Sequence, residues 1–357
     1  EFRRVRFRSA SYYDSSLVDG MAGSVNTPPN KDIRWEKTTT VNVGVDFALF
    51  RHRLSGTIEY YNKYSVDLLA AINGSPTQGF GYTTLMTNNG KMVNRGVEIT
   101  LSGEIIRQKD FSWNASLLYA FNRNKVKHIS VQPSLWDSRI SMPTSYPMVG
   151  KPLYGIYAYK WAGLNENGDP QVYDAENNVT SGPARDYHAL VYCGTTVPIH
   201  NASLTNVLRY KGFEFSAMLI LDAGHKLRSS NIPSINMSNG RITSTAKGIV
   251  DRWTQPGDVT DVPRLLFSND TENFNTHRTE LYRYSDLFVY DASNIRLSNI
   301  SLAYRVPAHW CKKISLSGAR LQFNVENVAT FAFDSKANYD LGGKVKPNYV
   351  WGLYLNF

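Results

Sequence analysis

The side chains that carry out most enzyme chemistry are present in this chain, but they form no recognisable catalytic or metal-binding motif. Acid pairs such as Asp258/Asp261 lie in polar stretches expected to be loops, whereas glycoside hydrolysis needs two opposed acids in a cleft. No nucleophile elbow, zinc-protease helix motif, phosphate-binding loop or dinucleotide glycine motif occurs. The histidines are dispersed, and none pairs at i,i+4 with another strong ligand type: His52, His128, His188, His200, His225, His277 and His309. The sequence predicts no enzyme, no metal site and no cofactor.

The cysteines and the charge also argue against several classes of protein. Cys193 and Cys311 have no neighbouring cysteine, so a paired-cysteine metal or redox motif is excluded, and a disulfide between them stays open. The net charge is +9, and the basic residues are scattered, with small groups at 51–53 and 312–313 in expected turns. A nucleic-acid-binding surface would need clustered basic residues on one face, and none is expected here.

Aromatic side chains are the best candidates for a binding function. The chain has 22 Tyr, and aromatic residues make up 13% of it. Rings with a polar tip can stack on sugars or hold peptide side chains, and they can equally pack inside loops or against a partner. The candidate ligand contacts in expected loops are Phe80, Tyr82, Trp136, Tyr146, Phe274 and Tyr282.

Alternation of apolar and polar residues predicts the elements that position these side chains. The last ten residues place Tyr349, Trp351, Leu353, Leu355 and Phe357 on every second position, which is one face of a β-strand. A terminal strand with such a row is typical of the closing strand of a transmembrane barrel. An edge strand of a soluble sandwich is the alternative from this strand alone.

The same period of two recurs along the chain as long hairpins. Val41 to Leu49 and Leu54 to Tyr60 alternate around a turn at 51–53, and similar pairs are expected at 93–106 with 111–126, within 199–222, and at 294–306 with 316–329. Such strands suit a membrane crossing, which takes about 9–11 residues. No apolar run approaches the roughly 18 residues of a spanning helix, and the mean hydropathy is -0.35.

The connections alternate between short and long. Short turns are expected at 51–53, 107–110, 211–212 and 307–313, and long polar loops at 14–36, 67–92, 127–153, 175–198, 225–292 and 333–347. This asymmetry is typical of outer-membrane barrels, with turns in the periplasm and loops outside. The prediction is an all-β, transmembrane antiparallel β-barrel with about 10 to 12 strands in this chain, the number depending on how 4–13 and 154–174 are divided into strands. Because the chain opens in an expected strand, we expect it to be part of a longer polypeptide.

Ordered short motifs extend this prediction to a family. They are Asn30 to Lys37, Val43 to Phe47, Leu54 to Lys63, Asn88 to Ile99, Tyr154 to Leu164, Tyr210 to Phe215, Asp251 to Thr254, Pro263 to Leu265, Asp291 to Leu302, and Asn324 to Val328 followed by the ending at Phe357. In their order and spacing these stretches resemble the SusC/RagA-like TonB-dependent outer-membrane transporters over nearly the whole chain.

The resemblance implies that residues 1–357 are the C-terminal part of a plugged barrel of about 22 strands, with the plug and TonB box outside this chain. It implies TonB-dependent import of glycans or oligopeptides, with a SusD-like surface lipoprotein as lid and TonB reached through the N-terminal part. It also gives barrel assembly as the role of Trp351, Leu353, Leu355 and Phe357. The alternatives are a siderophore or cobalamin receptor and a non-transporting surface-binding β-protein.

The family often carries an Asp/Gly-rich stretch, of which only fragments remain here. They are Asp169, Asp174, Glu176 and Asn178. A calcium ion takes six or more oxygen ligands, so an ordinary polar loop is expected instead.

Overall fold

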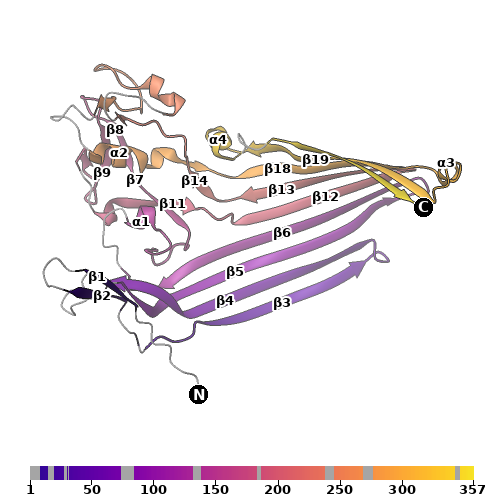
Figure 1. Ribbon diagram of the computed structural model, residues 1–357, viewed down its shortest axis with the longest axis horizontal. Helices are drawn as coiled ribbons and strands as arrows, with labels where there is room; N and C mark the ends of the chain where they lie inside the picture. The colour runs from indigo at the N-terminus through magenta and orange to yellow at the C-terminus, as the bar shows by residue number, and fades with distance from the viewer. Residues whose placement is uncertain are drawn as a thin grey trace.

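A single long antiparallel sheet dominates the computed structural model (Figure 1). The structure describes residues 9–14, 20–27, 30, 32–73, 84–131, 138–182, 186–237, 245–267, 276–341 and 346–357. Within this part the sheet has nine strands in the order β20-β19-β18-β13-β12-β6-β5-β4-β3, all antiparallel. Tight turns lie at one end of the sheet, and an assembly of loops and short elements lies at the other (Figure 1).

The nine strands are 9 to 24 residues long, enough to cross a bilayer at a tilt. Their bounds are β3 Lys37–Leu49, β4 Leu54–Asn73, β5 Thr84–Arg107, β6 Phe111–His128, β12 His200–Tyr210, β13 Phe213–Ala223, β18 Asn294–Arg305, β19 Gly318–Ala332 and β20 Asn348–Asn356. The expected hairpins and the short turns at 51–53, 107–110 and 211–212 are confirmed, whereas the segment 307–313 holds a short helix within the connection from β18 to β19.

The remaining strands form small separate sheets. They are β1 Ser9–Asp14 with β2 Met21–Thr27, β7 Gly155–Tyr159 with β11 Leu190–Thr195, β8 Trp161–Leu164 with β9 Pro170–Tyr173 and β10 Val179–Thr180, β14 Lys226–Arg228 with β17 Val289–Asp291, and β15 Asn236–Met237 with β16 Leu266–Phe267. The helices are short: α1 Ser138–Ser141, α2 Thr276–Arg283, α3 Ala308–Lys312 and α4 Asn338–Leu341, with 3₁₀ turns η2 Tyr187–Ala189, η3 Lys247–Asp251, η4 Asp286–Phe288 and η5 Ser335–Ala337. None of the helices found in the described ranges has the length and apolar character needed to span a bilayer.

Two details of the strand prediction differ from the structure. The long sheet has nine strands within the described residues, where about 10 to 12 strands were expected in the chain, because the described part of 4–13 pairs with β2 and 154–174 folds into the loop assembly as β7, β8 and β9. The expected long loop at 67–92 is mostly strand, since β4 and β5 continue past the membrane-length core of the hairpin. Asn88 joins the two strands here, since its Nδ2 donates to the Asp67 carbonyl at 2.6 Å. A bulge beside Asp67 interrupts the alternation of apolar and polar residues in this part of β4.

One face of the nine-stranded sheet is apolar over most of its extent. Cross-strand partners form apolar rows, for example Ile58, Ile99, Tyr119, Ala202 and Leu221 in one row and Trp113, Leu208, Phe215, Leu302, Phe323 and Trp351 in another. Many of these side chains are exposed. An exposed apolar surface of this extent marks contact with a membrane or a partner, and outer-membrane strands alternate apolar-out with polar-in. We refer to it as the outer face.

The last strand occupies an edge of the sheet, and β3 occupies the other (Figure 1). Trp351 belongs to the outer face, is 78% exposed, and lies against Phe323 with ring centroids 4.2 Å apart. Leu353 and Leu355 continue the same row, and Phe357 beyond it is 92% exposed. The expected strand with its apolar alternation is confirmed, whereas its role in barrel assembly stays a prediction.

Close packing of β4, β5 and β6 depends on a glycine. A Cβ at Gly96 would collide with the ring of Tyr61 and with the Phe121 carbonyl oxygen. We expect Gly96→Ala to lower the unfolding free energy by about 1–3 kcal/mol, since overpacking forces the backbone apart. Urea unfolding of the purified full-length protein measures the loss. Gly103→Ala in the same strand is the control, because its Cβ would have its nearest neighbour, Ile105 Cδ1, at 3.4 Å. Equal midpoints for the two variants would contradict the prediction.

Candidate functional site

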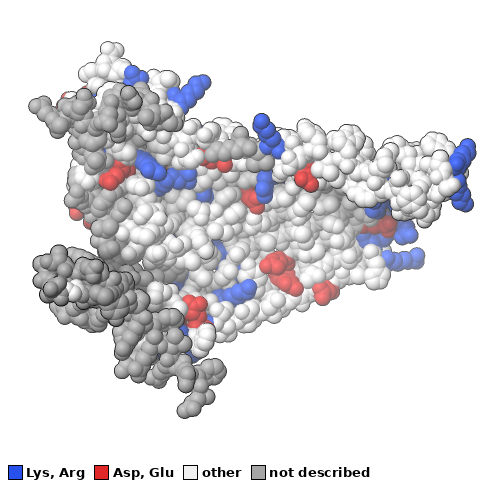
Figure 2. Space-filling view, viewed as in Figure 1, with Lys and Arg blue, Asp and Glu red and all other residues white. Residues whose placement is uncertain are grey.

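The face opposite the outer face carries the polar side chains of the sheet. They include Asp46, Thr57, Glu59, Glu98, Thr100, Asn201, Ser203, Asp222, Arg296 and Thr330. Thr57 donates to Asp46 at 2.6 Å, and Asp222 accepts from Asn201 at 2.7 Å and from Arg296 at 3.1 Å. Figure 2 shows acidic and basic side chains dispersed along the sheet instead of forming one field of a single sign. A wall of this kind suits a water-filled interior.

A second polar cluster lies on this face near the turn end of the sheet. Glu214 on β13 accepts from Arg209 Nε at 2.7 Å and from Arg320 at 3.1 Å, which joins three strands. The pairs are part-exposed, so each adds little to stability on its own. Their geometry fixes the orientation of neighbouring strands in a region without an apolar core.

The buried core of the described residues lies mainly in the loop assembly. Tyr157 and Tyr159 on β7 are almost fully buried with Leu281 of α2, and Val172 of β9 packs with them. Arg228 connects the layers by donating to the Tyr157 carbonyl at 2.7 Å and to the Arg283 and Ser285 carbonyls at 3.2 Å. The assembly is therefore a packed structure attached to one end of the sheet.

A buried ionic network holds the assembly together. Asp169 accepts two bonds from Arg264, at 3.1 and 2.8 Å, and one from Arg278 Nε at 3.1 Å. Arg278 is only 3% exposed and also donates to the carbonyls of Ile235 and Arg264. Burial lowers the pKa of the Arg278 guanidinium, and the negative charge of Asp169 opposes that shift. From the sequence, Asp169 was expected only as a fragment of the family's Asp/Gly-rich stretch. Its ion pairs could not be predicted, because Arg264 and Arg278 lie far from it in the sequence.

Metal and thiol chemistry find little support in the described part of the chain. No three His, Cys, Asp or Glu side chains among these residues lie close enough together to hold a metal ion. Cys193 and Cys311 are both free, which answers the question of a disulfide. Burial raises the pKa of the Cys193 thiol to about 11, so the reactive thiolate is scarce at neutral pH.

Of the six aromatic candidates, Tyr146 and Tyr282 fall within the described residues. Phe80, Tyr82, Trp136 and Phe274 lie outside the described residues. Tyr146 is half-buried, and its carbonyl accepts from Arg139 at 3.3 Å. The expectation that Tyr282 contacts a ligand is corrected, because this residue is 1% exposed. Its ring packs between Trp161 and Phe288, with ring centroids 5.9 and 4.9 Å away. Its place on α2, which the strand-based pattern missed, turns the ring into the loop core and away from any ligand.

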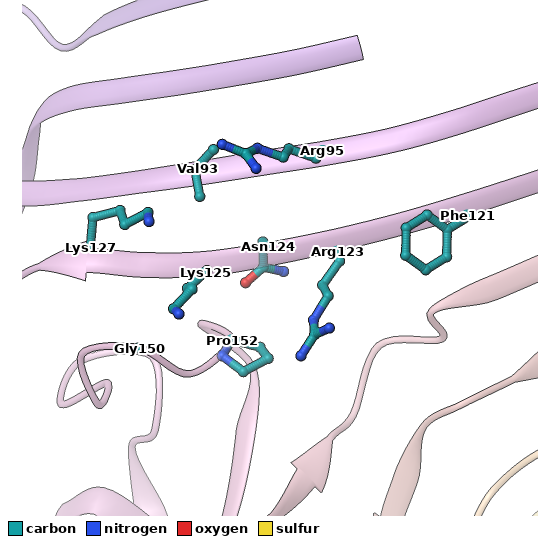
Figure 3. Close-up of a pocket in the computed structure, with 9 residues that line it drawn as sticks. All are labelled: Val93, Arg95, Phe121, Arg123, Asn124, Lys125, Lys127, Gly150 and Pro152. Carbon is teal, nitrogen blue, oxygen red and sulfur yellow. The ribbon is translucent and has the colours of Figure 1, made fainter. Parts of the chain in front are cut away.

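The expectation of scattered basic residues also needs correction. Arg95, Arg123, Lys125 and Lys127 line one groove with Val93 and Phe121 (Figure 3). Arg123, Lys125 and Lys127 stand on alternate positions of the sequence, which was the signal available. Arg95 joins them only through the pairing of β5 with β6.

Comparison with known proteins links this architecture to one family. A family model described as TonB dependent receptor-like, beta-barrel matches residues 4–328. TonB-dependent receptor P3 of Formosa agariphila is 25% identical over 346 residues, covering 91% of this chain and 33% of that protein. TonB-dependent receptor SusC of Bacteroides thetaiotaomicron is 25% identical over 312 residues, covering 84% of this chain and 29% of that protein.

A solved structure shares the fold. The RagAB peptide transporter aligns with a TM-score of 0.75 and 22% identity, over 99% of this chain and 39% of that one. The chain therefore spans well under two thirds of the length of these similar proteins.

The ionic network of the loop assembly can be tested with two matched substitutions. Asp169→Asn should destabilise the assembly by about 3 kcal/mol or more, because it leaves a buried arginine without its counter-charge. Hydrogen exchange of the amides of 155–173 in the purified full-length protein would then be faster, by roughly 100-fold if the assembly opens locally. Asp291→Asn is the control, since its pair with Lys226 is more exposed and its loss should cost below about 1 kcal/mol. Similar exchange in both variants would refute the structural role of the network.

Proposed function

Because the chain belongs to the TonB dependent receptor-like β-barrel family, we propose that it forms the C-terminal part of the barrel of an outer-membrane transporter that imports large nutrients. The observation that carries the proposal is the division of one sheet into an apolar outer face and a polar inner face. A wall between lipid and water needs both faces along strands long enough to cross the membrane. The family is one of outer-membrane receptors and transporters rather than of enzymes.

The substrate class and the lid are the finer part of the proposal. We infer that the cargo is a glycan or an oligopeptide and that a SusD-like surface lipoprotein covers the loops. Similarity to SusC and to a structure described as a peptide transporter supports this inference. Tyr146 remains a proposed cargo contact, as do the candidates outside the described residues.

The remaining parts of the full-length protein would complete the transporter. Among the described residues the sheet ends at β3 on one side and at β20 on the other, and the chain covers 39% of the matched structure. We propose that further strands, a plug and a segment that contacts TonB belong to the same transporter. The outer-face row of Trp351, Leu353 and Leu355, with Phe357 at its end, would then serve barrel assembly by packing against lipid next to the closing seam.

Uptake by the native organism tests the proposed transport. Deleting the gene should abolish growth on one of two polymers supplied as sole nutrient, a glycan or an oligopeptide. Deleting TonB should have the same effect. A surface lipoprotein should co-purify with the tagged full-length protein from outer membranes. Normal growth on both polymers, together with lost uptake of an iron chelate or cobalamin, would favour the alternative receptor class. A protein at the outer membrane whose deletion changes no uptake would indicate a non-transporting surface protein.

The orientation can be tested by cysteine labelling of intact cells. Val259→Cys, in a fully exposed loop, should react with a membrane-impermeant maleimide, and Lys313→Cys, at the turn end, should react only after lysis. The wild-type background should be low because Cys311 is buried and the pKa of Cys193 is raised to about 11. The reverse labelling pattern would overturn the proposed placement of loops outside and turns in the periplasm.

A further inference from the structure

A groove rich in positive charge lies where β5 and β6 approach the loop assembly (Figure 3). We call it the basic groove; its lining residues are Val93, Arg95, Phe121, Arg123, Asn124, Lys125, Lys127, Gly150 and Pro152, and its volume is about 380 Å³. The four cationic side chains are exposed, and Val93 is buried at its floor. The groove therefore offers concentrated positive charge over an apolar base.

Strand register places the basic groove on the outer face. Arg95 lies opposite Arg123, and two residues further along, Val97 lies opposite Phe121. Ile99 opposite Tyr119 is the next step of the same row. Because side chains two apart share a face, the arginines continue the apolar outer face towards the loop end. They do not point into the polar interior.

The charge of the groove is not neutralised within the described part of the protein. Like charges directly opposite each other on neighbouring strands destabilise a sheet, yet Arg95 and Arg123 form such a pair. None of the ion pairs between described residues involves Arg95, Arg123, Lys125 or Lys127. An external anion would relieve this repulsion.

The groove is formed in advance by backbone pairing. Gly150 N–H donates to the Val126 carbonyl at 2.8 Å, and Val126 N–H donates to the Lys151 carbonyl at 3.0 Å. Leu153 N–H donates to Asn124 Oδ1 at 2.8 Å, which holds the rim beside Pro152. Arg95 Nε donates to Asn62 at 3.0 Å, so the guanidinium is oriented before any ligand arrives.

We propose that the basic groove binds the phosphate groups of an anionic glycolipid in the outer leaflet of the membrane. The inference rests on the loops-outside orientation of the proposed function. Arginine pairs with phosphate oxygens in a bidentate manner, and lysine adds point charge. Acyl chains attached to the same headgroup would lie along the apolar outer face next to the groove. An acidic protein partner fits less well, since the groove lies on the lipid-facing side of the strands and not on their polar face.

Lipid retention by the purified full-length complex tests this site. One variant replaces Arg95, Arg123, Lys125 and Lys127 with Gln, and the control replaces Arg51, Lys109, Lys312 and Lys313, which are exposed residues at the turn end, with the same change of net charge. We expect native mass spectrometry to find phosphorylated glycolipid on the wild type and the control. Because the groove variant lacks several phosphate contacts, the occupancy of glycolipid on it should fall at least fivefold. Detergent-solubilised lipid A and its dephosphorylated form are then titrated in parallel, and only the phosphorylated lipid should distinguish the variants.

Each alternative outcome is separable. Equal lipid on the groove variant and the control would overturn the proposal. Unchanged lipid with loss of the co-purifying lipoprotein would overturn it in favour of a protein contact. Displacement of lipid A by an equal concentration of inorganic phosphate would overturn the lipid as occupant and leave a free-phosphate site. Nutrient uptake is measured in parallel in the deletion strain. Uptake unchanged by the deletion, with lipid binding that still depends on the groove, would overturn the transport proposal and leave the lipid site standing.

Discussion

Strands that cross a bilayer must satisfy every backbone N–H and C=O group through a neighbouring strand, because lipid offers no partner. The nine-stranded sheet meets this constraint by continuous antiparallel pairing from β3 to β20. Everything else in the chain depends on that pairing. Since the sheet has water on one side and an apolar phase on the other, it needs no core of its own, and packing between side chains contributes less than register and close approach of strands.

The loop assembly solves a different physical problem. Its segments leave the sheet and must order polar backbone without a membrane around them, so they bury aromatic and aliphatic side chains around Tyr157 and Tyr159. Burying Arg278 in that core is costly unless its charge is matched. Asp169, Arg264 and backbone carbonyls supply the match from segments far apart in the sequence. The network thus links β9, α2 and the segment before β16 into one unit.

The sequence predicted the sheet well because its signal is local. The alternation of Val41 to Leu49 and of the final strand survives without any knowledge of partners, and so do the tight turns. The placement of Tyr282 could not be predicted in this way, because an aromatic ring in a polar stretch has the same local signature whether it faces solvent or fills a loop core. The extension of β4 and β5 escaped notice for a related reason: a bulge near Asp67 interrupts the period on which the prediction relied.

Strand register places cationic side chains of the basic groove on the outer face of the sheet. The pairing that sets Arg95 opposite Arg123 also sets Gly96 opposite Tyr61 and Asn122 on the other face. If β5 slipped by one residue against both of its neighbours, its side chains would exchange faces: Arg95 would turn inward, Glu98 would reach the outer face, and a residue with a Cβ would lie against Tyr61 where a glycine fits. The close approach at Gly96 therefore favours the observed register of β5, and that register decides which charges of β5 lie on the outer face and which lie on the polar face. The placement of Arg95 on the outer face is thus tied to a packing constraint on the opposite face, between β4 and β5.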